Sequence, residues 1–96
     1  MMLYRLIIGL NDKDEGVQVI SNSKIKQLIA DTFETGIVTF GDEVYLGDVN
    51  PVVTIEIQAI SQVEAVIFKK AETLKSLLNQ DYILYSRQEL LKNELI

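Results

Sequence analysis

Residues 52–60 read VVTIEIQAI, and residues 61–79 continue as SQVEAVIFKKAETLKSLLN. In the first stretch apolar and polar residues alternate, which is typical of a strand with one buried face and one wet face. In the second stretch apolar residues recur three or four positions apart, which predicts an amphipathic helix ending near Asn79. Ser61 and Glu64 have the spacing of a capping box, so we expect that helix to begin there. At Ser61 the spacing of the apolar residues changes from alternation to helical spacing. This change predicts a strand that leads into a helix.

The residues before this stretch predict a second strand joined to the first. Residues 37–46 contain Val38, Phe40, Val44 and Leu46 at one parity, and we expect these four side chains to face the core. Gly41 interrupts the strand and predicts a bulge. Residues 47–51, GDVNP, are typical of a turn. Residues 37–60 are therefore expected to form an antiparallel hairpin.

The outer parts of the chain add a strand and a helix before the hairpin and a strand after it. Residues 3–10 are nearly all apolar and predict a central strand, and residues 11–16 (NDKDEG) predict a loop. After a short β-like patch at 17–20, helical spacing predicts a helix over 23–35 that stops at Gly36. Residues 82–85 predict a short fourth strand, and residues 87–96 a helical tail.

The order of these elements is β-α-β-β-α-β in a single domain over residues 1–96, with the tail at 87–96. With right-handed crossovers, that order gives an α+β ferredoxin-like sandwich, in which two helices cover one face of a four-stranded antiparallel sheet. The other face is then open.

The open face of this sheet is expected to bind a partner. The hairpin contributes Thr39, Glu43, Tyr45, Thr54, Glu56 and Gln58 to it, and either parity of the first strand adds apolar side chains. An uncovered apolar patch usually marks an interface, so we predict a homodimer. A tail folded back over the face and a heterologous partner or ligand are the alternatives. The residues expected at the dimer interface or open face are Tyr4, Tyr45, Thr54 and Gln58.

Charge is distributed unevenly along the chain. The net charge is −5, and there is no Lys or Arg between Lys26 and Lys69. A negative surface of this kind favours docking on a basic protein surface and discourages direct binding to nucleic acid. A solvated surface that only aids solubility is the alternative. The predicted partner-binding residues are Asp12, Asp14, Glu15, Asp42, Glu43, Asp48 and Glu56.

The residue types present exclude several kinds of chemistry. The chain has no Cys and no His, which removes thiol catalysis, Ser-His-Asp systems and Cys/His metal sites. Residues 11–22 lack the ligand spacing of a calcium loop. The hairpin lacks the basic and aromatic platform of an RNA-recognition domain. We therefore predict no enzyme activity, no catalytic residue, no cofactor and no metal. The apolar run at 3–10 is too short to span a membrane, and the expected location is the cytoplasm.

Two short segments carry a resemblance to a known group. Residues 5–14, RLIIGLNDKD, and residues 76–96, SLLNQDYILYSRQELLKNELI, resemble small uncharacterised bacterial and phage proteins that begin with an "IGLNDKD" strand and carry "LNQ" before the last strand. This resemblance implies a ferredoxin-like fold and carries no activity with it.

Taken together, these observations predict a non-enzymatic, acidic protein-binding module of phage or mobile-element origin. Such a module would resemble an anti-CRISPR inhibitor and would dock its acidic hairpin on a basic, nucleic-acid-binding surface of a host protein. A homodimeric ligand-sensing or regulatory domain is the alternative.

Overall fold

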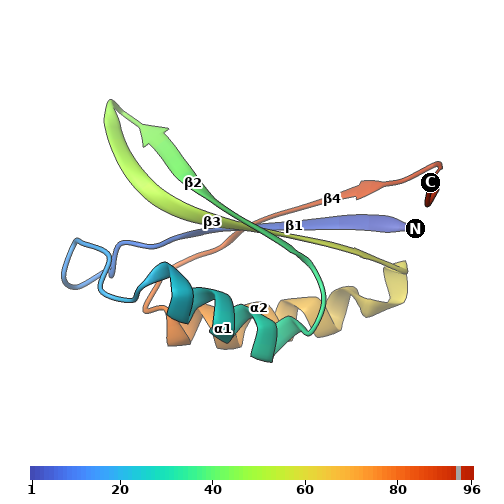
Figure 1. Ribbon diagram of the computed structural model, residues 1–96, viewed down its shortest axis with the longest axis horizontal. Helices are drawn as coiled ribbons and strands as arrows, with labels where there is room; N and C mark the ends of the chain where they lie inside the picture. The colour runs from blue at the N-terminus through green and yellow to red at the C-terminus, as the bar shows by residue number, and fades with distance from the viewer. Residues whose placement is uncertain (93) are drawn as a thin grey trace.

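The computed structural model describes residues 1–92 and 94–96 and contains four strands, two α-helices and one short 3₁₀ turn (Figure 1). In chain order the elements are β1 (Met2–Gly9), α1 (Asn22–Phe33), β2 (Ile37–Tyr45), β3 (Asp48–Ala59), the 3₁₀ turn η1 (Ser61–Val63), α2 (Glu64–Leu77) and β4 (Leu84–Glu89).

The four strands form one antiparallel sheet in the order β2-β3-β1-β4. Both helices lie on the same side of it (Figure 1). This arrangement confirms the predicted ferredoxin-like sandwich. Its central strands are β1 and β3, and β2 and β4 form the two edges.

The core lies between the sheet and the helices. Leu6 on β1 pairs with Ile55 on β3, and both are buried. Side chains from both helices close over this pair and its neighbours, because each helix presents an apolar stripe to the sheet. The buried side chains that the helices contribute are Ile25, Ile29 and Phe33 from α1 and Ile67, Ala71 and Leu74 from α2.

The β2–β3 hairpin is longer and more regular than predicted. A two-residue turn at Leu46 and Gly47 joins the strands, with φ angles of 50° and 86°. Positive φ at both positions matches the right-handed twist of the flanking strands. Residues 48–51 therefore pair within β3 instead of forming the predicted turn. Gly41 pairs directly with Val52, so the predicted bulge is absent.

The far end of this hairpin, residues 42–51, extends past the helix layer, and we call it the arm (Figure 1). Val44 and Leu46 were expected in the core but are 70% and 86% exposed. Val44 does lie on the helix side of the sheet, as its parity predicts. The helices do not reach that far along the hairpin, so no element covers the side chains there.

Strand β4 and the tail also differ from expectation. Arg87 and Glu89 lie in β4, where they pair with Tyr4 and Met2, instead of in a tail helix. Beyond Glu89 the described residues form no helix or strand, and Leu91 and Leu95 are exposed. The free edge of β1 offers backbone partners, and pairing there overrides the helical preference of this segment.

The helix ends agree only in part with those predicted from the sequence. The Ser21 hydroxyl accepts a hydrogen bond from the Lys24 amide and caps α1. The left-handed residue after α1 is Glu34, with φ of 66°, and not the expected Gly36. The predicted capping box does not form. Ser61 lies in the 3₁₀ turn, and the Glu64 carboxylate forms an ion pair with Arg87 instead.

Candidate functional site

The open face of the sheet carries the side chains that alternate with the core. Tyr45, Thr54 and Glu56 lie on this face, as predicted, because their strand neighbours point toward the helices. Gln58 shares their parity. Tyr4, however, is fully buried on the helix side, where its hydroxyl donates to the Ile60 carbonyl at 3.1 Å. The sequence left both parities of β1 open, and the pairing of Tyr4 with Ile57 decides between them.

At the centre of the open face an ion pair joins β1 to β3. Arg5 Nη2 lies 3.2 Å from Glu56 Oε2, and both side chains are partly exposed. Glu56 is therefore paired with Arg5 of the same chain, and it lies apart from the acidic residues of the arm. The nearby apolar side chains on this face are Leu3, Ile7, Ile37 and Leu84.

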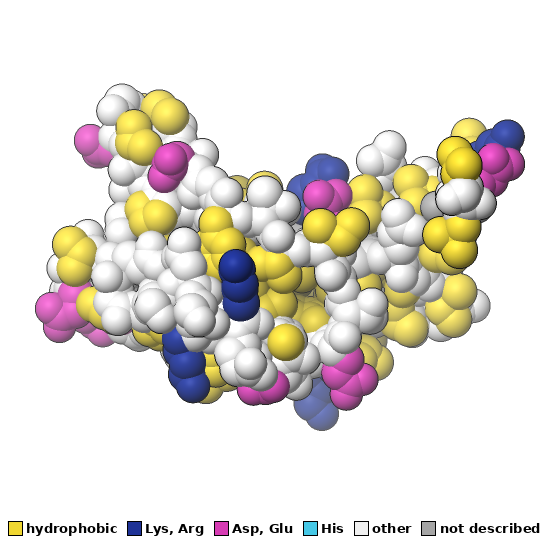
Figure 2. Space-filling model, viewed as in Figure 1, with side chains coloured by type: hydrophobic (Ala, Val, Ile, Leu, Met, Phe, Trp, Pro, Cys, Tyr) yellow, Lys and Arg dark blue, Asp and Glu magenta, His cyan; other side chains and the backbone are white. Residues whose placement is uncertain are grey.

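The arm brings together three of the predicted partner-binding residues. Asp42 and Asp48 are exposed and Glu43 is half-buried. Exposed apolar side chains lie beside these acids, and Val44 pairs across the hairpin with Val49. Figure 2 shows acidic and hydrophobic side chains side by side at the end of the projecting arm. The arm thus presents negative charge and exposed apolar surface together.

The other predicted acidic group, in the loop after β1, is mainly tied to its own backbone and to a distant turn. Asp12 is 9% exposed, and one of its oxygens accepts from the amides of Asp14 and Glu15, each at 3.0 Å. Its other oxygen accepts from the Asn79 side-chain amide at 2.9 Å. The Asn79 and Glu15 hydrogen bonds lower the pKa of Asp12 below its usual 3.8. Asp14 and Glu15 are exposed.

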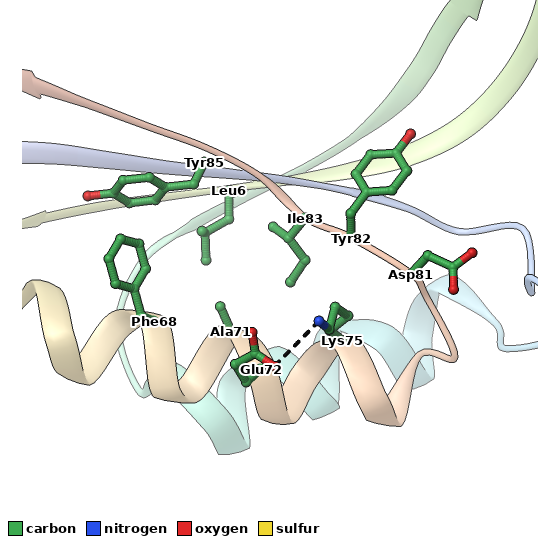
Figure 3. Close-up of a pocket in the computed structure, with 9 residues that line it drawn as sticks. All are labelled: Leu6, Phe68, Ala71, Glu72, Lys75, Asp81, Tyr82, Ile83 and Tyr85. Atoms are coloured by element: carbon green, nitrogen blue, oxygen red, sulfur yellow. Dashed lines mark ion pairs between the residues drawn. The ribbon is translucent and has the colours of Figure 1, made fainter.

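A pocket of about 290 Å³ lies between α2 and β4 (Figure 3). Leu6, Ala71 and Ile83 form its apolar floor. Phe68 and Tyr85 lie at one end, and Asp81 and Tyr82 at the other (Figure 3). Glu72 and Lys75, from α2, complete the lining. None of these residues was predicted as a site residue.

The aromatic end of the pocket is a small cluster of rings. The rings of Phe68 and Tyr85 meet edge to face, with centroids 4.6 Å apart, and Tyr4 stacks on Tyr85 from within the core at 6.4 Å. The Tyr85 hydroxyl oxygen is buried, with no hydrogen-bond partner of good geometry among the described residues. Burial, and then the nearby Glu64 carboxylate, raise the pKa of Tyr85, so the phenol is protonated at neutral pH.

The charged side of the pocket holds groups of both signs. Lys75 Nζ lies 3.4 Å from Glu72 Oε2 (Figure 3). Asp81 Oδ1 lies 3.6 Å from the Nζ atom of Lys13, which belongs to the loop after β1. The sequence showed Glu72 and Lys75 one helical turn apart, but only the packing of α2 on β4 brings them beside Asp81 and the rings.

The described part of the chain lacks two further kinds of site. No group of three or more His, Cys, Asp or Glu residues there is placed to hold a metal ion. No helix there is long and apolar enough to cross a membrane.

Comparison with known proteins finds a likeness in fold. No protein-family model and no curated protein matches the sequence. A solved structure does match: a phage SAM lyase in its apo state, with a TM-score of 0.71 and 15% sequence identity. The match covers 91% of this chain and 78% of that chain. The two proteins share a fold. At this identity the likeness shows nothing more than the fold.

Proposed function

We propose that this chain binds S-adenosylmethionine in the pocket between α2 and β4 and cleaves it as a lyase. The observation that carries the proposal is the chemistry of the pocket lining. The phage SAM lyase adds support, because it shares the fold over 91% of this chain.

The pocket offers counterparts for several groups of this ligand. The ligand has a purine, a sulfonium, an ammonium and a carboxylate. The rings of Phe68 and Tyr85 suit the purine, since aromatic rings pack well against one another. The carboxylates of Glu72 and Asp81 suit the two cationic centres, and the Lys75 ammonium suits the ligand carboxylate. A volume of about 290 Å³ lies at the small end of ligand pockets.

A sulfonium substrate also removes the main objection to an enzyme. The sequence predicted a non-enzymatic protein because Cys, His and a catalytic constellation are missing. Cleavage of a sulfonium releases a neutral thioether, which is already a good leaving group. In an elimination of this kind a carboxylate takes a proton from the carbon next to the one bonded to sulfur, the electrons of that C–H bond form a C=C bond, and the C–S bond breaks with its electron pair leaving on the thioether. The protein then has to orient the substrate, exclude water and place a carboxylate near that proton. Glu72 and Asp81 are the carboxylates at the pocket.

Calorimetric titration with S-adenosylmethionine tests the binding, with chromatography of the mixture to detect a released thioether nucleoside. We expect S-adenosylhomocysteine, which lacks the sulfonium charge, to bind more weakly. Lys75→Gln and Glu72→Gln should each weaken binding by about tenfold, because each removes a charge-assisted contact. Lys92→Gln and Glu94→Gln remove a similar ion pair that does not line the pocket and should leave binding unchanged. Absence of binding to the unmodified chain, or equal effects of the two pairs of variants, would overturn the proposal.

We propose, as a second function, that the arm docks on a basic surface of a host protein, as a phage-encoded inhibitor would. The support is the arm itself: it projects beyond the helices and places Asp42, Glu43 and Asp48 beside exposed Val44 and Val49. Charge would steer the encounter, and the apolar side chains would then be buried in the contact.

Capture from host lysate at two salt concentrations tests this second function. We expect a basic, nucleic-acid-binding protein to be held at about 50 mM salt and released at about 200 mM. The double reversal Asp42→Lys with Glu43→Lys should abolish capture, and reversal of Glu94 in the exposed tail should not. If the double reversal captures the same protein equally well, the arm is not the docking surface.

A further inference from the structure

Two segments that lie more than 60 residues apart in the sequence are joined by a set of polar contacts at one end of the molecule. These segments are the loop Asn11–Asp14, after β1, and the turn Asn79–Gln80, after α2. We call their contacts the latch. We infer that Asn79 and Asp12 are positioning residues for the pocket, holding the segment that carries Asp81 and Tyr82 to its end.

The latch consists of several specific hydrogen bonds. The Asn79 side-chain amide donates to Asp12 Oδ1 and to Asp14 Oδ2, both at 2.9 Å. The Lys13 backbone amide donates to the Asn79 carbonyl at 3.2 Å, and the Gln80 side chain donates to the Asn11 carbonyl at 2.7 Å. A single carboxamide thus bridges two carboxylates. Because Asp12 is also bonded to the amides of its own loop, the latch has a fixed anchor.

The latch acts directly on one end of the pocket. Residues 78–83 link the end of α2 to the start of β4 and belong to no helix or strand. Three residues of this link, 81–83, line the pocket. Asn79 has a left-handed φ of 51°, so the chain turns sharply there before it reaches Asp81. Lys13, from the same loop as Asp12, forms the ion pair with Asp81.

The consequence for binding is a population effect. If the latch is lost, the link has no regular backbone pairing to hold Asp81 and Tyr82 in place, and the pocket-forming conformation becomes one of several. The apparent dissociation constant then rises by the inverse of the populated fraction. This use of the latch rests on the proposed function, whereas the ordering of residues 81–83 does not.

Asn79→Gly is the decisive variant because glycine tolerates the left-handed backbone, removes the side-chain amide that bridges Asp12 and Asp14, and leaves the backbone bond from Lys13 in place. Glu34→Gly is its matched control, since Glu34 is also left-handed, with φ of 66°, and has no part in the latch. Backbone order parameters from ¹⁵N relaxation give the first measurement. We expect values near 0.85 at residues 81–83 in the unmodified chain and below about 0.6 in Asn79→Gly, with no change in Glu34→Gly.

Titration with S-adenosylmethionine gives the second measurement. Asn79→Gly should raise the dissociation constant by about tenfold. In an Asp81→Asn background the same change should have a much smaller effect, because both act on one contact. A general loss of structure would not produce this non-additivity.

The outcomes separate the two proposals. If the unmodified chain does not bind S-adenosylmethionine, the proposed function fails and the order parameters alone decide whether the latch positions residues 81–83. If the chain binds and Asn79→Gly binds equally well, or if residues 81–83 keep their order in that variant, the positioning role is overturned.

Discussion

At the scale of single residues, Asp12 shows how one side chain can be misjudged when only its charge is visible. In the sequence it is part of an acidic run, Asp12, Asp14 and Glu15, which suggests a docking surface. In the structure it is nearly buried and accepts hydrogen bonds from its own loop and from Asn79. Asp14 and Glu15 are the members of that run that remain exposed.

The contacts of Asp12 predict a dependence of stability on pH. Its pKa is lowered in the folded chain from 3.8, so its contribution is fully present above that value and is lost as the pH falls through the depressed pKa. We expect the melting temperature of the unmodified chain to fall below about pH 4, and Asp12→Asn to reduce this slope. Thermal denaturation between about pH 2 and pH 6 measures it. Glu94→Gln is the control in the exposed tail, and an equal slope in Asp12→Asn would contradict the assignment.

At the scale of elements, the β2–β3 hairpin and β4 show what competes with local preference. Residues 48–51 look like a turn, but a tighter turn at Leu46 and Gly47 allows them to extend β3. Residues 87–89 have helical preference, but they pair with the free edge of β1 and form part of β4. In both cases backbone pairing with a neighbouring strand is the stronger effect. The arm is the direct result, because longer strands carry Val44 and Val49 beyond the reach of the helices.

At the scale of the whole molecule, no helix or strand of the described residues covers the open face of the sheet. Leu3, Ile7, Ile37 and Leu84 surround the Arg5–Glu56 ion pair there. Ile37 and Leu84 are at least half exposed. An apolar face of this kind is commonly buried between subunits. Self-association through it would suit the alternative of a homodimeric ligand-sensing domain.

Light scattering tests the predicted homodimer directly. We expect a mass of twice the 10.9 kDa of one chain. Ile37→Lys should shift the chain to a monomer, because it places a charge in the buried interface. Val17→Lys changes a similarly exposed aliphatic side chain in the loop after β1 and should leave the dimer intact. A monomer for the unmodified chain at about 100 μM would contradict the prediction, since a specific interface of standard size gives tighter binding.

The sequence by itself determined the order of the elements and most of the core, because the hydrophobic period is a local property of the chain. The hydrophobic periods along the whole chain predicted the β-α-β-β-α-β order and, with it, the ferredoxin-like sandwich. The sequence could not show which parity of β1 faces the helices, where the helices stop covering the hairpin, or that Asp12 meets Asn79. It could not show the pocket either, since Phe68 and Lys75 meet Asp81 and Tyr85 only when α2 packs beside β4. Those relations join residues that are distant along the chain, and only tertiary packing brings them together.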